Sequence, residues 1–376
     1  MRAMLGVTAA LGVAAAMTMS VAPASLASTA KTGSTSAAFA AKPPYSIVLS
    51  NNFLGNDWRP QVEKLAKLTA NVPPFKGVVN LRIVNSADTN QAQLGDLNSI
   101  IETKPNAILL IPGSTTALDP AIQRACAAGI LVFTLSAPVE APCAINLNQN
   151  FYAGNQAMGQ WMAKAMKGTG SVFIDQGVPG LGISETIENG FLQGLHQYGP
   201  KITVAGKYTG EYAPGPEQQG ISSLLVAHPN VGGIMTQGYC TPAFNALKAA
   251  GKAAVPTVCY GYNGEMEACA TAGHQCAILT NSTGQVQTAM LLALNILEGK
   301  QKAPHGGYAQ KYWVSYPMYL YVTASPMVHL VTSMAVTSVQ VLKKNVNFFP
   351  GLPSGLSLPY TLPQYAKYIT PQQAAG

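Results

Sequence analysis

The sequence predicts an α/β protein with two doubly wound, Rossmann-like lobes, each built on a parallel sheet. Three observations carry this prediction. The chain has 376 residues, which exceeds the roughly 150 residues of one ordinary domain. Beyond residue 44, short β-branched runs alternate with segments of helical spacing, and the alternation restarts after residues 145–147. Strands that alternate with helices form right-handed crossovers, so each half should hold a parallel sheet covered on both faces.

The first half begins with continuous apolar runs that are typical of buried strands and with helices whose apolar residues recur at i, i+3 and i+4. We predict strands at residues 46–50, 78–84, 107–111 and 130–135, and helices at 62–69, 94–101 and 121–128.

The second half repeats this pattern with five helices and five strands. We predict helices at 152–166, 184–198, 217–227, 242–250 and 264–272, and strands at 171–175, 202–205, 232–236, 256–260 and 276–280. A further helix at 285–298 has no evident place in this half. Residues 313–320 and the Val/Thr/Ser-rich run to 342 have the composition of strands, but the pattern does not give their topology. Because residues 348–360 are rich in Pro and Gly, we expect an extended tail packed on the surface.

The N-terminal segment has the features of an export signal. Arg2 precedes an apolar run at 4–19 and small residues at 22–27, so residues 1–27 are predicted to be a signal peptide and residues 28–43 a flexible leader. A retained membrane helix is the alternative, disfavoured because the run is short and rich in Ala and Gly. No cysteine precedes Cys126, so we expect an exported protein of the periplasm or the extracellular face that is not lipid-anchored.

Composition and motifs exclude several functions. The chain is 48% hydrophobic, which excludes a disordered protein, and its 22 Lys and Arg residues form no cluster of the kind that binds nucleic acid. The catalytic patterns GxSxG, HExxH and GxxxxGK[ST] do not occur, and the five histidines are scattered singly. The glycines of residues 176–182 do not have the spacing of a dinucleotide-binding turn. We therefore expect no enzyme, no cofactor, no metal and no nucleic-acid partner.

Six cysteines in an exported chain indicate disulfides, and fifteen pairings are open to them. Pairing between sequence neighbours is preferred because each pair would flank a single predicted helix or strand. The preferred pairs are Cys126 with Cys143, Cys240 with Cys259, and Cys269 with Cys276. None has CxxC or Cys/His spacing, so a zinc site is not expected.

The loop after the first strand carries the most distinctive chemistry. In a parallel sheet, loops at the carboxyl ends of strands border the ligand crevice. Amide groups both donate and accept hydrogen bonds, as hydroxyl groups do, while an indole offers a flat apolar face and a guanidinium a planar fork of donors. The candidate ligand-binding residues of this loop are Asn51, Asn52, Asn56, Trp58 and Arg59. In the alternative interpretation Trp58 is a core aromatic residue and the asparagines cap the helix.

Other predicted strand ends carry similar residues. The further candidates are Ser114, Ser136, Glu185, Gln237, Tyr239, Tyr260, Tyr262 and Asn281. Aromatic rings and neutral hydrogen-bonding groups, without an evident base or nucleophile, favour recognition over turnover.

The chain resembles the ribose- and galactofuranose-binding branch of the type I periplasmic solute-binding proteins, which serve ABC sugar importers. The resemblance covers residues 45–300 and rests on Gly-x-x-Trp-Arg at 55–59, Asn-Ala-Ile-Leu-Leu-Ile-Pro-Gly-Ser at 106–114, Asn-Gly-Phe at 189–191, Ala-His-Pro-Asn-Val at 227–231 and Leu-Glu-Gly-Lys at 297–300. It implies a monomer that captures a small sugar or polyol for a membrane permease.

The resemblance also implies three crossings between the lobes, with a ligand cleft between them. The N-terminal lobe would comprise residues 44–147 and 282–311, the C-terminal lobe 148–281 and 312–345, and the tail 346–376.

Several charged residues of the family's binding sites are replaced in this sequence. Ser136-Ala137 stands where the family has an Asp-Arg-like pair, Gly261 where it has an acid, and Glu185 lies in the stretch where it has an arginine. Ribose is therefore disfavoured, and a less common sugar, a polyol or a more aromatic ligand is expected. Alternatives are an exported sensor without transport and a secreted hydrolase, although the catalytic carboxylate pair that a hydrolase requires cannot be located. The export signal replaces the DNA-binding segment of related repressors.

Overall fold

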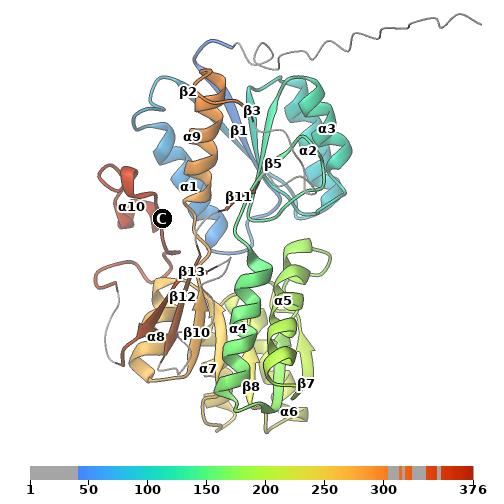
Figure 1. The fold of residues 1–376 in the computed structure, drawn as a ribbon, viewed down its shortest axis with the longest axis vertical. Coiled ribbons are helices and arrows are strands. Elements are labelled where there is room, and N and C mark those ends of the chain that lie inside the picture. Colours follow the sequence, from blue (N-terminus) through green and yellow to red (C-terminus); the bar gives the residue numbers. More distant parts are fainter. Residues whose placement is uncertain (1–40, 304–312, 316–317, 324–335, 345–348, 376) are drawn as a thin grey trace, which may run out of the picture. The chain divides into compact units, whose positions relative to one another are not determined.

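The computed structural model describes residues 41–303, 313–315, 318–323, 336–344 and 349–375. Within them the predicted α/β fold with two doubly wound lobes is confirmed (Figure 1). The predicted signal peptide and nearly all of the predicted leader lie outside the described residues, as does the region around Lys311.

In the described residues the first sheet has six strands, in the order β11-β5-β4-β3-β1-β2, and every neighbouring pair is parallel. Its strands are β1 Tyr45–Asn51, β2 Val79–Asn85, β3 Ala107–Ile111, β4 Leu131–Leu135, β5 Ile145–Asn148 and β11 Trp313–Ser315. Its helices are α1 Trp58–Ala70, α2 Asn90–Glu102, α3 Asp119–Ala127 and α9 Gln285–Leu297.

Helices cover both faces of this sheet. Ile47 and Leu49 belong to the core layer under α1 and α9, whereas Val48 belongs to the layer under α2 and α3. Figure 1 shows α1 and α9 on one side of the sheet and α2 and α3 on the other. Burial on both faces explains why the centre of β1, Ile47-Val48-Leu49, is continuously apolar rather than alternating. Val286 and Met290 of α9 pack in the first layer, so the helix without a place in the second half returns to the first lobe.

The second sheet has seven strands within the described part of the chain, in the order β13-β12-β10-β9-β8-β6-β7. Its strands are β6 Thr169–Asp175, β7 Lys201–Tyr208, β8 Gly233–Met235, β9 Thr257–Tyr260, β10 Cys276–Leu279, β12 Met318–Thr323 and β13 Val336–Leu342. All pairs are parallel except β10 with β12. The helices are α4 Phe151–Ala165, α5 Gly182–Tyr198, α6 Pro214–Ala227, α7 Thr241–Ala249 and α8 Asn263–Ala272.

The chain passes between the sheets after β5, after β10 and after β11. One boundary of the prediction was wrong. Residues 312–345 were assigned to the C-terminal lobe, but Trp313–Ser315 pairs with β5 in the first sheet, and the second sheet resumes at Met318. An apolar run indicates a strand but not the sheet that the strand joins, and this run contains two strands in different sheets.

The C-terminal segment also differs from the predicted extended surface tail. It contains the 3-10 helix η2 Pro363–Tyr365 and the helix α10 Pro371–Ala375, which packs near α1. Leu356 and Tyr365 are buried in the same core cluster as α1 and α9. Proline disfavours strands and helix interiors, but it is tolerated in the first turn of a helix, where Pro363 and Pro371 stand. It also does not remove the free-energy gain from burying the apolar residues between the prolines.

All three preferred disulfides are confirmed. The Cα–Cα distances are 6.3 Å for Cys126–Cys143, 5.2 Å for Cys240–Cys259 and 6.2 Å for Cys269–Cys276. The sulfur atoms of Cys240, Cys269 and Cys276 lie within 4.8 Å of one another. All three are engaged in disulfides and so are not thiolate ligands for a metal. Among the described residues, no helix combines the length and the apolar character needed to span a bilayer.

Candidate functional site

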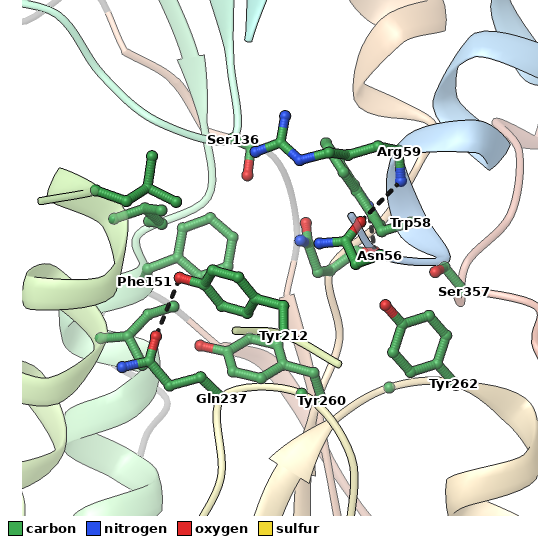
Figure 2. Close-up of a pocket in the computed structure, with 16 residues that line it drawn as sticks. Asn56, Trp58, Arg59, Ser136, Phe151, Tyr212, Gln237, Tyr260, Tyr262 and Ser357 are labelled. Carbon is green, nitrogen blue, oxygen red and sulfur yellow. Dashed lines mark hydrogen bonds between the residues drawn. The ribbon is translucent and has the colours of Figure 1, made fainter. Parts of the chain in front are cut away.

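Residues from both lobes line a cavity at the carboxyl ends of the two sheets (Figure 2). Its volume is about 50 Å³, against roughly 10–15 Å³ for one water molecule. This is room for a small molecule rather than for a chain of sugar residues. The lining residues are Asn56, Trp58, Arg59, Ser136, Phe151, Leu181, Ile183, Ile187, Tyr212, Gln237, Gly238, Tyr260, Gly261, Tyr262, Asn281 and Ser357.

Trp58 and Arg59 enter the cavity from the first turn of α1. The Oδ1 atom of Asn56 accepts a hydrogen bond from the backbone N–H of Arg59 at 3.1 Å, which satisfies a free donor at the start of the helix. The Nε1 atom of Trp58 donates to the carbonyl oxygen of Asn281 at 3.0 Å. Trp58 is only 4% exposed and also packs in the main core cluster. Both interpretations of this loop therefore apply. Its residues line the cavity, as expected of a binding loop, and at the same time Trp58 packs in the core and Asn56 caps the helix.

Arg59 is a buried cation, 6% exposed. Its Nη1 atom donates to Oδ1 of Asn51 at 2.6 Å, and its guanidinium lies 4.0 Å from the ring centroid of Phe53. The Nδ2 atom of Asn51 donates in turn to Oε1 of Glu63 at 3.2 Å. Burial lowers the pKa of Arg59 to about 9, so the side chain stays charged at pH 7. In Figure 2 the guanidinium extends over the cavity toward Ser136.

The second lobe contributes aromatic side chains. The rings of Phe151 and Tyr260 lie 6.2 Å apart, and the Tyr260 hydroxyl accepts a hydrogen bond from Nδ2 of Asn155 at 2.8 Å. The Tyr212 hydroxyl donates to Oε1 of Gln237 at 3.1 Å. Burial raises the pKa values of Tyr212 and Tyr260, so both phenols stay protonated. The Tyr212 proton is donated to Gln237, whereas the Tyr260 hydroxyl accepts from Asn155 and keeps its proton for donation.

Two buried carboxylates that do not line the cavity hold the backbone of residues 237–239 in place. Asp175 accepts from the backbone N–H of Gln237 at 2.9 Å, and Glu217 accepts from the backbone N–H of Tyr239 at 3.0 Å. A Cβ atom on Gly238 would lie 2.4 Å from Oε1 of Glu217, so a larger residue there would displace this carboxylate. Burial raises the pKa of Asp175 to about 6, and burial together with the charge of Asp175 raises the pKa of Glu217 well above its usual range.

The structure brings eight of the predicted residues together around the cavity, and five lie elsewhere. The eight are Asn56, Trp58, Arg59, Ser136, Gln237, Tyr260, Tyr262 and Asn281. The other five are Asn51, Asn52, Ser114, Glu185 and Tyr239.

Each of these five residues lies outside the cavity lining, in contact with other parts of the protein or exposed to solvent. Asn51 supports Arg59, and Asn52 is buried beside Gly113. The Ser114 hydroxyl accepts from the backbone N–H of Ala117 at 3.1 Å, as serine often does in turns.

Glu185 is exposed in the first turn of α5. The ring of Tyr239 stacks on that of Tyr262 at 4.7 Å, and its hydroxyl donates to Oδ2 of Asp57 at 2.9 Å. A position at a strand end did not fix which way these side chains point.

Six lining side chains were not among the candidates: Phe151, Leu181, Ile183, Ile187, Tyr212 and Ser357. Four of them follow strand ends, since Leu181 and Ile183 come after β6, Tyr212 after β7 and Phe151 after β5. The strand-end rule could have found these four, and searching for polar groups alone missed the apolar ones. Ser357 lies in the C-terminal segment, where the sequence carried no such signal.

Comparison with known proteins gives the family. Residues 47–301, more than half of the chain, match the family model described as the periplasmic binding protein domain. The chain is 28% identical over 185 residues to the xylitol-binding protein of Mycolicibacterium smegmatis, covering 48% of this chain and 53% of that protein. It is 25% identical over 233 residues to the ribose import binding protein RbsB of Bacillus subtilis, covering 61% and 73%. The chain therefore matches about half the length of the first relative.

A solved structure has the same fold. The solute-binding protein of an ABC transporter from Thermobispora bispora superposes with a TM-score of 0.65 at 23% identity, covering 73% of this chain and 84% of that chain. The match of residues 47–301 to the family model confirms the family expected from the motifs. This protein belongs to the periplasmic binding protein domain family.

Proposed function

We propose that this protein is an extracytoplasmic solute-binding protein, which captures a small sugar or polyol and presents it to the membrane permease of an ABC importer. The observation that carries the proposal is the small cavity at the carboxyl ends of both sheets, lined by aromatic rings and hydrogen-bonding groups. The relatives that bind xylitol and import ribose support the same ligand class.

The chemistry of the cavity supports binding rather than turnover. Its lining residues, all within the described part of the chain, include no carboxylate, histidine or cysteine. The lining serines and tyrosines could take part in catalysis only with a neighbouring base to activate them, and no lining residue supplies that base. Flat rings such as those of Trp58 and Tyr260 instead suit the C–H faces of a polyhydroxylated molecule.

The arrangement of the chain supports capture by closure. The ligand would be held by groups from both lobes, and three segments join those lobes. A ligand that contacts both lobes stabilises the closed state relative to the open state by its differential affinity. A permease that recognises the closed state would then receive only loaded protein.

The proposal includes export and a monomeric state. Membership of a periplasmic family implies an extracytoplasmic location, and three disulfides suit an oxidising compartment. We propose that export follows cleavage within residues 22–27 and that the mature protein carries no lipid anchor.

The test is a ligand screen by thermal unfolding, followed by calorimetry, with xylitol, ribitol, D-ribose, D-arabinose, glycerol and their acid derivatives. A ligand at a hundredfold excess over its Kd should raise the free energy of unfolding by about 2.7 kcal/mol. The recovered ligand should be chemically unchanged, as judged by NMR after incubation. Binding by none of these compounds, or conversion of one of them, would refute the proposed function.

A further inference from the structure

Most of the N–H donors of Arg59 have no acceptor among the described residues. A guanidinium carries five N–H donors and no acceptor. In the described part of the chain, its one side-chain hydrogen bond is from Nη1 to Asn51. The Nε atom is buried without an acceptor. Burying unpaired donors of a charged group costs free energy that a ligand in the cavity can recover.

The positive charge of Arg59 is also incompletely balanced. Two carboxylates act on it from outside the cavity: Glu63 through the amide of Asn51, and Asp88 through space. Neither lines the cavity, and among the lining residues of the described chain Arg59 alone is formally charged. Any ligand enclosed here therefore meets one positive charge and no negative one.

The remaining polar groups do not supply the missing acceptors. The hydroxyl oxygen of Tyr260 already accepts from Asn155, which leaves its proton free to donate. Oε1 of Gln237 already accepts from Tyr212, and the carbonyl oxygen of Asn281 accepts from Trp58. Each of these three oxygens thus already accepts one hydrogen bond, whereas Arg59 offers several donors that have no acceptor among the described residues. Every hydroxyl of a neutral polyol brings a proton that needs an acceptor, whereas a carboxylate brings acceptors alone.

We propose that the ligand carries a carboxylate, which makes it a small sugar acid or polyhydroxy acid, and that the carboxylate pairs with Arg59. This rests on the proposed function, since the remaining hydroxyls and C–H groups meet the same rings and amides as a sugar would. Guanidinium and carboxylate match as a planar, bidentate pair, whose hydrogen bonds are stronger than those between neutral groups.

The experiment compares acids with alcohols of the same carbon skeleton by calorimetry at pH 7.5. The probes are D-xylonate against xylitol, D-ribonate against ribitol, and glycerate against glycerol. We expect at least one acid to bind at least tenfold more tightly than its matching alcohol. If the alcohol of every pair binds as tightly as its acid, the inference is refuted while the proposed function stands. If no probe binds, both are refuted.

Two variants locate the preference at Arg59. Arg59→Gln keeps hydrogen-bonding groups but removes the charge, and Asn51→Asp places a carboxylate on Nη1 at nearly unchanged shape. Each should weaken binding of the acid at least tenfold and binding of the alcohol much less. The control is Arg82→Gln, at an exposed arginine on β2 that bonds Thr103. Circular dichroism and thermal unfolding check the fold of each variant. An unchanged acid-to-alcohol ratio in a folded Arg59→Gln or Asn51→Asp protein would contradict the role of Arg59.

Discussion

At the residue scale, the first loop shows what side-chain chemistry can and cannot predict. The types of Asn56, Trp58 and Arg59 indicated a binding surface, and all three line the cavity. The same reasoning placed Asn51 in the site, but its side chain points to Arg59 and Glu63 instead. Sequence gives the donors and acceptors of a loop, but only the packed structure decides whether each of them meets a ligand or another side chain.

Trp58→Phe should weaken ligand binding. The substitution keeps an aromatic face but removes the hydrogen bond from Nε1 to the carbonyl oxygen of Asn281, which joins α1 to the segment after β10. The freed carbonyl should reduce the free energy of unfolding by about 1–3 kcal/mol. We expect the affinity for the ligand found by the screen to fall about threefold to tenfold, measured by calorimetry.

Trp161→Phe is the matched control, because Trp161 is buried in α4 and does not line the cavity. It should change stability but leave affinity within about twofold. Equal losses of affinity in both variants would show that Trp58 acts only through the general packing of the fold.

At the element scale, the C-terminal segment is the part that the sequence predicted least well. The side chain of Gln61 in α1 forms two hydrogen bonds to the backbone of the C-terminal segment. Its Nε2 atom donates to the carbonyl oxygen of Gly355 at 2.6 Å, and its Oε1 atom accepts from the N–H of Ser357 at 2.9 Å. Ser357 also forms a bridge with Tyr262 in the other lobe. The segment thus contacts both lobes beside the cavity. No periodicity reveals such a contact, because it depends on one side chain that is distant in sequence.

Gln61→Ala should loosen this segment and weaken ligand retention. It removes both hydrogen bonds at once and leaves a backbone N–H and a carbonyl oxygen with lost partners, a cost of about 1–3 kcal/mol. We expect faster ligand dissociation in stopped-flow measurements and faster cleavage of the C-terminal segment in limited proteolysis.

Gln372→Ala is the control, since the exposed Gln372 also donates to a backbone carbonyl of this segment, that of Gly351. It should leave both rates nearly unchanged. If the two variants behave alike, the segment is a passive covering of the core rather than a brace between the lobes.

At the scale of the whole molecule, the alternation of strands and helices predicted both lobes, because the pattern directly reflects which faces are buried. Val48 between Ile47 and Leu49 illustrates this, since all three are apolar and they serve two opposite layers. The antiparallel pairing of β12 with β10 and the separation of β11 from β12 were not predictable. These late strands lie at one end of the strand order in each sheet, beyond β5 and β10, where composition does not select a partner.

The stability of the molecule should depend on pH through Asp175. This carboxylate is fully buried and faces Glu217, Tyr208 and Glu188, and burial raises its pKa from 3.8 to about 6. Between about pH 4 and pH 6 the folded protein keeps a proton that the unfolded chain releases. The resulting stabilisation is complete below about pH 4 and is lost as the pH rises through about 6. A shift of about two units corresponds to a change on the order of 3 kcal/mol.

Asp175→Asn isolates this contribution, because the amide does not titrate in this range and still offers one oxygen to the N–H groups of Gly177 and Gly210. Denaturant unfolding at pH 4.5, 5.5 and 7.5 should show wild type gaining stability relative to the variant as the pH falls. The difference between the two proteins should change by about 2 kcal/mol over this range. Glu102→Gln, at the exposed end of α2, serves as control. The difference in unfolding free energy between this variant and wild type should vary much less with pH.

A difference in unfolding free energy between wild type and Asp175→Asn that is the same at pH 4.5 and 7.5 would mean that Asp175 stays ionised in the fold. The three hydrogen bonds that Asp175 accepts from backbone N–H groups would then stabilise the ionised carboxylate by more than burial of its charge costs.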